Sequence, residues 1–521
     1  MFRNAVLFLI VALCFKAEGF TRNRGEIDVN QADRPLLMVH YMPWYQAQPL
    51  RRWGWHWTMD HFNPDRMDDS GRREIASHFY PLTGPYDSND EKILEYQVLL
   101  MKLSGIDGLI ADWYGSEDFF DYALINESTH KIFQYAEKAG LLFAVCYEDQ
   151  TIKHMVENGH FDASEAITHG WLAMGYLEDE WFVNDLYLKL GNQPVLLNFG
   201  PQYFFSSSNW ETLFSILNES PHLFTLDNRI SPAATGAFPW PPMSRAVNGI
   251  LTTSALNQYL NSFYQKAAAW TYSIGGAFPG FHDIYAQAGL GFTYGYLDAA
   301  DGQTFTSTLQ KAIDSNPDVI QLITWNDFGE GTNIEPTIEY DYKYLEIIQN
   351  LRRTSIDTSF SYTADDLLLP FQIYELRLKY DNDEEKSALL DDVFDAIIAD
   401  DLTTAKDILE KLGATTRVET NEPLPSEFSL EQNYPNPFPR SGSAFADNPQ
   451  TTISYELQKP GKVNLSIYNI SGQLIKTLLD NNQSEGRHAI TWDAGRRAPG
   501  LYFYKITFGN STEIKKMVLI R

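Results

Sequence analysis

Three carboxylic acids follow an apolar run in the stretch TWNDFGEGTNIEP, residues 324–336. Asp327 and Glu330 are three residues apart with glycines beside them, so both side chains can reach one opening at the end of a strand. Two such carboxyl groups can act as proton donor and proton acceptor, which is the chemistry of glycoside hydrolysis. We predict that Asp327 and Glu330 are the catalytic pair. Glu335 fits either a substrate contact or a structural role.

A catalytic pair needs a scaffold, and the first two thirds of the chain alternate between apolar runs and helical patterns. This alternation predicts an α/β fold, a (β/α)8 TIM-type barrel over residues 31–355. One helical segment, DEKILEYQVLLMKLSG, is expected to end at Gly105. The eight predicted strands are residues 36–41, 108–113, 141–147, 194–199, 223–226, 234–238, 271–277 and 319–325.

The active site of such a barrel lies at the C-terminal ends of its strands, where the loops converge. Acids and aromatic residues occupy these positions, and aromatic faces can hold sugar rings. Capping of the following helix explains Asp112, Asp149 and Asp283 equally well. The candidate substrate contacts at the strand ends are Tyr41, Trp44, Asp112, Trp113, Glu148, Asp149, His282 and Asp283.

The loop RRWGWHWTMDHFNP after the first predicted strand is rich in tryptophan. Large aromatic side chains in a glycine-containing loop are costly to expose unless they contact a ligand. We interpret Trp55, His56 and Trp57 as a wall of a sugar subsite, with simple packing as the alternative. His56 taken alone also fits a hydrogen-bonded scaffold role.

Other chemistries lack their usual patterns in this sequence. A G-x-S-x-G elbow, a glycine-rich phosphate loop with Lys or Arg, and HExxH or CxxC spacings are all absent. We therefore expect no metal ion and no cofactor. The net charge of −28 repels phosphate backbones, which argues against nucleic acid as a partner.

Residues 1–19 have the pattern of a secretory signal peptide. Arg3 precedes an apolar run, residues 5–15, that is too short to cross a bilayer. We expect no membrane span after this segment is removed. Cys146 is then the one cysteine left, and we expect it to be buried and inert.

The composition changes after Thr354. Helical spacing of apolar residues predicts a short acidic helical hairpin within residues 360–415, which we interpret as a spacer. Short alternating strands with turn signals between them predict a small β-sandwich over residues 427–521.

The last segment resembles the C-terminal sorting domain of the type IX secretion system, through LEQNYPNPF and SIYNISGQLIKTL. This resemblance implies the type IX secretion machinery as a partner and export across an outer membrane. It also implies removal of the domain, followed by attachment to the cell surface or release as a secreted protein. A sugar-binding module is the structural alternative.

The motifs HYMPWY, WGWHWTM, FPGFHD and WNDFGEGTNIEP resemble the endo-α-mannosidases of glycoside hydrolase family 99. Residues 325–330 also resemble the α-1,3-glucanases of family 71, which typically read W-N-D-Y-G-E. The endomannosidases read N-E-W-H-E-G-T-x-I-E, so Asp327 replaces a glutamate here. The resemblance implies Glu330 as general acid and Asp327 as general base, and it adds Asn326 and Glu335 as substrate contacts.

These patterns together predict an exported hydrolase of α-linked glycans that is endo-acting on α-mannan or α-mannosides. The substrate is a polysaccharide or oligosaccharide. An α-1,3-glucanase and a non-catalytic surface glycan-binding protein are the alternatives. We expect Glu330 to hold a proton near neutral pH, and Asp327, in a wetter environment, to stay ionised.

Overall fold

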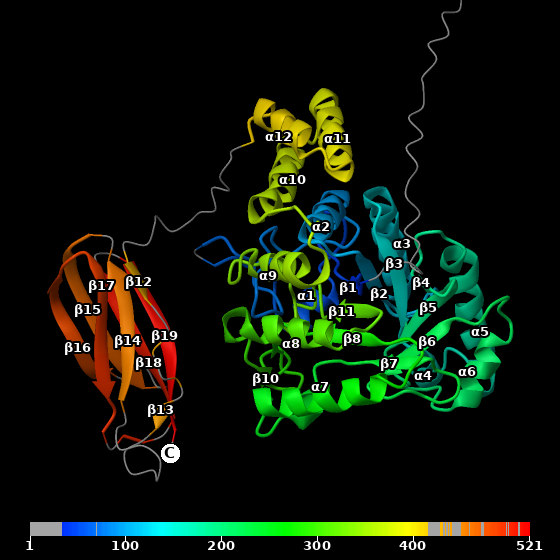
Figure 1. Cartoon of the computed structure of the whole chain (residues 1–521), viewed down its shortest axis with the longest axis horizontal. Helices are drawn as coiled ribbons and strands as arrows, with labels where there is room; N and C mark the ends of the chain where they lie inside the picture. The colour runs from blue at the N-terminus through cyan, green and yellow to red at the C-terminus, as the bar shows by residue number, and fades with distance from the viewer. Residues whose placement is uncertain are drawn as a thin grey trace, which may run out of the picture. The chain divides into compact units, whose positions relative to one another are not determined.

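The computed structural model describes residues 34–68 and 70–414, and parts of 428–520. The gaps in the last range are residues 431–432, 434–435, 437, 440–449, 458, 470–473, 496, 499 and 509–510. The chain divides into two compact units, Met1–Thr416 and Arg417–Arg521 (Figure 1). The predicted signal peptide, residues 1–19, lies outside the described residues.

The centre of the first unit is a parallel sheet with the strand order β7-β6-β5-β3-β2-β1-β11-β8. The two end strands lie close together, since a Cβ added to Gly276 of β8 would lie 2.7 Å from the Pro239 ring after β7. The sheet is therefore a nearly closed barrel, as predicted. Its strands are β1 (Leu36–Tyr41), β2 (Gly108–Trp113), β3 (Leu142–Tyr147), β5 (Gln193–Asn198), β6 (His222–Leu226), β7 (Gly236–Phe238), β8 (Ile274–Ala277) and β11 (Val319–Leu322).

Each of the eight predicted strands overlaps one of these barrel strands among the described residues, with shifts at the ends. The last one stops at Leu322 instead of residue 325, because the chain turns there into the loop that carries the acids. The Trp325 N–H of that loop donates to the His40 carbonyl of β1 at 2.6 Å. The strand β4 (Lys189–Leu190) pairs antiparallel with β5 at the outside of the barrel.

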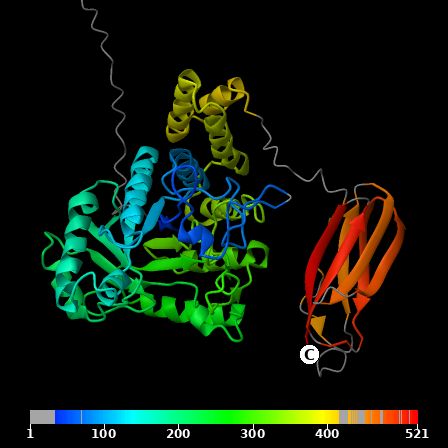
Figure 2. The ribbon, with the colours of Figure 1, turned by 180° about the vertical axis from the view of Figure 1, so that it is seen from behind.

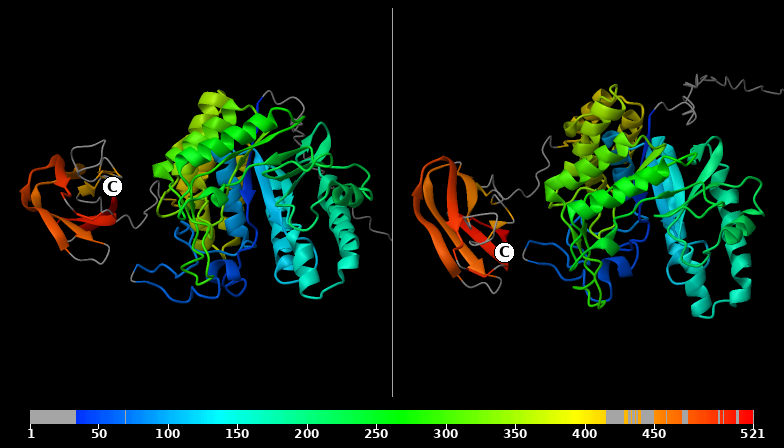
Figure 3. Two further views of the ribbon diagram at one scale, coloured as in Figure 1. Left: turned by 90° about the horizontal axis from the view of Figure 1, so that it is seen from below. Right: turned by 60° about the horizontal axis from the view of Figure 1, so that its bottom comes forward.

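Helices surround these strands in every view (Figures 2 and 3). The predicted helix is α2, and it ends where Gly105 adopts a left-handed conformation with φ 85°. Its first turn is capped by the Asp90 side chain, which accepts from the Lys92 N–H. The longer helices around the barrel are α2 (Glu91–Ser104), α3 (Tyr122–Ala139), α4 (Gln150–Glu157), α5 (Ala166–Leu177), α6 (Ser207–Phe214), α7 (Thr253–Ala267), α8 (Gln303–Asp314) and α9 (Lys343–Leu351).

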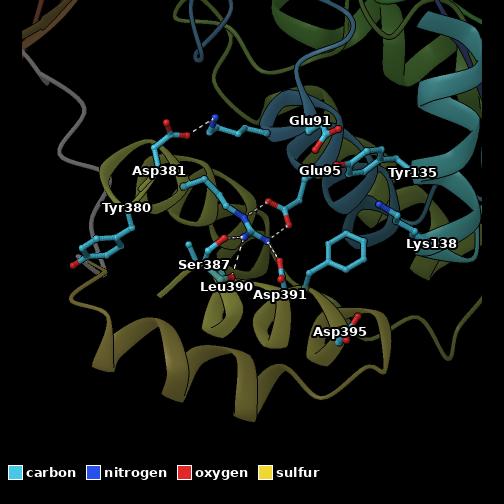
Figure 4. Close-up of a pocket in the computed structure, with 13 residues that line it drawn as sticks. Glu91, Glu95, Tyr135, Lys138, Tyr380, Asp381, Ser387, Leu390, Asp391 and Asp395 are labelled. Atoms are coloured by element: carbon cyan, nitrogen blue, oxygen red, sulfur yellow. Dashed lines mark hydrogen bonds and ion pairs between the residues drawn. The ribbon is translucent and has the colours of Figure 1, made fainter. Parts of the chain in front are cut away.

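The segment predicted as a helical spacer packs on the barrel within the first unit. It contains α11 (Glu384–Ile398) and α12 (Leu402–Lys411), and also α10 (Leu369–Lys379), a helix that the sequence analysis did not predict. Arg377 of α10 binds Glu95 of α2 at 2.8 and 2.9 Å, and Asp391 of α11 at 2.7 Å. These ion pairs border a polar groove of about 740 Å³ between the segment and the barrel. Figure 4 shows Glu95 and Asp391 in the groove that they line.

The second unit contains two sheets that face each other, which confirms the predicted β-sandwich. One sheet has the order β12-β14-β17 and the other β13-β19-β18-β15-β16. Buried Tyr455 and Trp492 of the first sheet share a core with Ile467 and Tyr504 of the second. The strands are β12 (Phe428–Leu430), β13 (Phe438–Pro439), β14 (Gln450–Leu457), β15 (Gly461–Asn469), β16 (Leu474–Gln483), β17 (Gly486–Asp493), β18 (Gly500–Phe508) and β19 (Ser511–Ile520).

None of the helices in the described residues combines the length and the apolar character needed to cross a bilayer.

Candidate active site

A cavity of about 260 Å³ lies at the C-terminal ends of the barrel strands. Asp327 and Glu330 from the loop after β11 both line it. The residues at and after the ends of β1, β2, β3, β5, β7 and β8 contribute the other walls. The sequence-predicted site residues that line this cavity are Trp44, Trp55, His56, Asp112, Glu148, Asp327 and Glu330.

A tight turn fixes the two acids of the last loop. The Glu330 N–H donates to Asp327 Oδ1 at 2.9 Å, and the Asp327 N–H donates to Thr324 Oγ1 at 2.8 Å. Gly331 has φ 64°, and a Cβ there would lie 2.7 Å from the His282 carbonyl, so only glycine fits. The His282 N–H in turn donates to the Glu330 carbonyl at 2.8 Å. The backbone therefore holds the acid pair in one arrangement.

Asn326, which precedes the pair, joins the last loop to the first loop of the barrel. Its side chain accepts from the Met42 N–H at 2.8 Å and donates to the Met42 carbonyl at 2.9 Å. The Tyr45 hydroxyl adds a bond to the Asn326 carbonyl at 2.9 Å. Asn326 is fully buried and lies behind the cavity wall, so it positions the pair rather than touching the cavity.

Burial decides the protonation of the acid pair. Asp327 is 5% exposed, and burial raises its pKa to about 7. Burial and then the negative charge of Asp327 raise the pKa of Glu330 well above its usual value. The raised pKa of Glu330 agrees with the sequence-based expectation. The expectation that Asp327 is the wetter acid is wrong, because the turn places it deeper in the protein than the partly exposed Glu330.

Two further acids line the same cavity. Asp112 and Glu148 are 2% and 3% exposed. Burial, followed by the charges of Asp112 and Asp149, raises the pKa of Glu148 well above its usual value. Gln150 and Gln202 donate to Glu148 Oε2 at 2.8 and 3.2 Å. Lys and Arg are absent from the cavity lining among the described residues, so its carboxyl groups face one another without a fixed cation.

Aromatic side chains form the remaining walls. Trp44 stacks on His56 with a centroid distance of 4.2 Å and an interplanar angle of 6°. Trp55 is 42% exposed and meets His56 edge-on at 5.2 Å. Burial lowers the pKa of His56 to about 3, so its ring is neutral. This arrangement suits the apolar faces of sugar rings.

Several aromatic residues of this wall were not among the predicted substrate contacts. Trp240 follows β7 closely, so the strand-end rule that found the acids also applies to it. The loop after β8 supplies further tyrosines, and Tyr285 donates to Glu330 Oε1 at a long 3.5 Å. The additional ring-bearing residues that line the cavity are His40, Tyr45, Tyr114, Phe199, Trp240, Tyr285, Phe292 and Tyr294.

Two predicted strand-end residues face away from the cavity because side chains alternate along a strand. His40 and Asp112 line the cavity, so their neighbours Tyr41 and Trp113 point outward. The Tyr41 hydroxyl donates to Gln97 of α2 at 2.8 Å. Trp113 is fully buried, and its ring stacks on Tyr176 of α5 at 5.7 Å.

Other predicted contacts have structural partners instead. Asp149 accepts from the N–H groups of residues 202–204 at 2.8 Å each, and Asp283 accepts from the Tyr294 and Gly295 N–H groups at 2.6 and 3.0 Å. His282 stacks on His78 at 3.7 Å.

Trp57 and Glu335 also lie behind the cavity wall, and both bind Tyr86. Trp57 is fully buried, and its Nε1–H donates to the Tyr86 carbonyl at 2.8 Å. Glu335 accepts from the Tyr86 hydroxyl at 2.7 Å and from Gln97 at 2.9 Å. Burial raises the pKa of Glu335 to about 7.

Residues 34–353 match the family model described as Glycosyl hydrolase family 99. The chain belongs to this family. The barrel is therefore a glycoside hydrolase of the endo-α-mannosidase-like type, as the resemblance implied. Residues 433–520 match the secretion system C-terminal sorting domain, which implies export.

The chain is also similar to curated relatives and to solved structures. The glycoprotein endo-alpha-1,2-mannosidase of Rattus norvegicus is 23% identical over 384 residues, which span 66% of this chain and 80% of the relative. The enzyme of the same name from Mus musculus is 23% identical over 389 residues, spanning 65% and 79%. The GH99 endo-alpha-mannosidase structure from Bacteroides thetaiotaomicron is 19% identical with a TM-score of 0.44, covering 60% of this chain and 95% of that one.

Proposed function

We propose that the barrel is an endo-acting hydrolase of α-mannan or α-mannosides, with Glu330 as general acid and Asp327 as general base. One observation carries this proposal: both carboxyl groups line one aromatic-walled cavity, and the Glu330 main-chain N–H donates to Asp327 Oδ1. An aromatic wall can bind the rings of a neutral sugar. A pair of acids can catalyse cleavage of the glycosidic bond between two such rings.

The pKa order supports the division of roles. Glu330 has the strongly raised pKa, so it carries the proton that the leaving oxygen takes as the glycosidic bond breaks. Asp327, with a pKa of about 7, is the acid that ionises first and accepts a proton. That proton comes either from the 2-hydroxyl of the donor sugar, which attacks C1 and leads to retention, or from a water molecule, which gives inversion.

The names of the relatives support the substrate class. The rat and mouse proteins are named glycoprotein endo-alpha-1,2-mannosidases, which points to internal cleavage of α-linked mannose. The sorting domain supports the proposal that the substrate lies outside the cell. The enzyme would act on it either attached to the cell surface or released.

The test is a comparison of two polysaccharides. The purified protein is incubated with α-mannan and with α-1,3-glucan, and the products are separated by size and their anomeric configuration is followed by proton NMR. We expect oligosaccharides from α-mannan, with chain length falling early as internal bonds break.

Release of oligosaccharides from α-1,3-glucan alone would establish the glucanase alternative. Retention of protein on a glycan without any cleavage would establish the glycan-binding alternative. The Glu330→Gln variant, run in parallel, shows whether any cleavage comes from this cavity.

A further inference from the structure

Three potential metal ligands from neighbouring strands meet inside the barrel. His40 lies on β1, Asp112 on β2 and Cys146 on β3. Asp112 is directly opposite Cys146 in the strand register, and His40 is opposite Ile110, two residues before Asp112 on the same face. One ligand atom from each of the three side chains lies within 4.8 Å of the other two, and all three residues are buried.

One ligand atom of His40 and one of Asp112 lack hydrogen bonds. His40 Nε2 and Asp112 Oδ1 are buried without a hydrogen-bond partner and face each other at 3.8 Å. This separation is too long for a hydrogen bond, and buried polar atoms without partners are costly. Two ligands at about 2.1 Å from a tetrahedral ion lie about 3.4 Å apart, so a small inward movement of the three side chains completes a coordination shell.

A second residue can orient His40 as a ligand. Gln321 of β11 has its Nε2 at 2.6 Å from His40 Nδ1, and its own Oε1 has no hydrogen-bond partner. If the Gln321 amide rotates by half a turn, its Oε1 can accept a hydrogen bond from the protonated Nδ1 of His40. The Nε2 of His40 then has a free lone pair for a metal ion. A hydrogen bond of this kind from the second ring nitrogen is the usual support of a metal-bound histidine.

The charge of the cavity favours a cation at this place. Asp112, Glu148, Asp327 and Glu330 line one cavity without a Lys or Arg in the described lining. Buried carboxylates are normally paired or bound to metal ions. A divalent ion below the cavity floor would compensate the charge of Asp112 and of those neighbouring carboxyl groups that are ionised.

We propose that His40, Asp112 and Cys146 form a binding site for a zinc-type divalent transition metal ion. Binding replaces the proton of the Cys146 thiol, which leaves to solvent, so that the sulfur coordinates as thiolate. Because His40 and Asp112 line the cavity, the fourth coordination position faces it, as in sites with three protein ligands. A thiolate and an imidazole select such an ion over Mg²⁺ or Ca²⁺, which prefer oxygen ligands.

Cobalt titration of the untagged protein without its signal peptide tests this site. Cys146 is the one cysteine of that chain, so a sulfur-to-cobalt charge-transfer band in the near ultraviolet reports this residue alone. We expect the band to saturate at one equivalent of Co²⁺ and to disappear when Zn²⁺ is added. Zn²⁺, and not Mg²⁺, should raise Tm.

Variants assign the ligands. Cys146→Ser should abolish the band, and His40→Ala and Asp112→Asn should weaken cobalt binding at least tenfold. His78→Ala, which changes a histidine outside the cluster, should leave the titration unchanged and serves as the matched control. Circular dichroism confirms that each variant folds.

Absence of the band in the wild-type protein would overturn the proposal, and this result needs no variant. Cobalt binding that Cys146→Ser leaves intact, or that His78→Ala removes, would also overturn it by placing the ion on the surface. None of these readouts depends on glycan cleavage, so failure here leaves the proposed function untouched.

Discussion

At the scale of single residues, burial gives Asp327 and Glu330 their chemical character. Both lie among aromatic side chains, and the charges that raise each pKa belong to other carboxyl groups. Both pKa values are therefore raised, and the order between them supports the roles that we propose. In the proposed mechanism the active form has Asp327 ionised and Glu330 protonated, so we predict that the rate falls below a pH of about 7 and again at higher pH, where Glu330 loses its proton.

Leaving-group dependence tests this assignment. Glu330→Gln should lower kcat/KM by roughly 10²–10⁴-fold on α-mannan, but much less on an activated aryl α-glycoside, which barely needs protonation. Asp327→Asn should impair both substrates. The basic limb of the pH profile should be missing from Glu330→Gln on the activated substrate. Near-native activity of both variants on every glycan that the wild type cleaves would show that the pair is assigned wrongly.

Glu335 gives a second prediction, on stability. Its pKa is about 7 in the folded protein and 4.5 in the unfolded chain, so the folded state binds the proton more tightly. Its contribution to stability is therefore fully present below about pH 4.5 and is lost as the pH rises through 7, on the order of 3 kcal/mol in total. The Glu335→Gln variant has no group that ionises at this position, so it does not lose this stability as the pH rises. Its side-chain oxygen can still accept a hydrogen bond from Gln97.

Urea unfolding of both proteins at pH 5 and pH 8 measures this difference. The variant should gain free energy of unfolding relative to the wild type at pH 8. An equal difference between the two proteins at both pH values would mean that Glu335 is ionised in the folded protein with an ordinary pKa.

At the scale of elements, the short helix α1 (Trp55–Thr58) in the first loop presents two tryptophans to different environments. Trp55 is 42% exposed at the cavity, whereas Trp57 is fully buried against Tyr86. Trp55→Ala should weaken glycan binding roughly tenfold, about 1.4 kcal/mol, and change stability by less than about 0.5 kcal/mol.

Trp57→Ala is the matched control and should cost about 3–5 kcal/mol of unfolding free energy. Calorimetric titration in the Glu330→Gln background gives the affinities, and thermal unfolding gives the stabilities. If Trp55→Ala lowers Tm as much as Trp57→Ala does, Trp55 belongs to the core and not to the subsite wall.

At the scale of the whole molecule, the two units have separate cores, so the second can be removed without opening the first. We predict that the protein on the cell surface lacks both the signal peptide and the sorting domain. Mass spectrometry of surface-released peptides should find peptides from residues 34–414 and none that ends at Arg521. Recovery of that C-terminal peptide from the surface form would contradict the prediction.

The sequence by itself determined the elements and the chemical type of the site. Apolar runs, the stop at Gly105 and the turn chemistry around Asp327 and Glu330 are local patterns, and the barrel strands, α2 and the acid turn formed where those patterns placed them. The helix α10 was missed because its contacts join residues far apart in sequence, as the ion pair between Arg377 and Glu95 does.

Only the tertiary structure decided which side of each element faces the cavity. Tyr41 and Trp57 are residue types that often line sugar sites, yet neither lines this cavity. Strand alternation directs Tyr41 to Gln97, and Trp57 packs against Tyr86. The tertiary structure also decided the depth of Asp327, because burial is the sum of contacts from several loops. It likewise brought His40, Asp112 and Cys146 together, since the pairing of three parallel strands sets their register and no spacing along the chain encodes it.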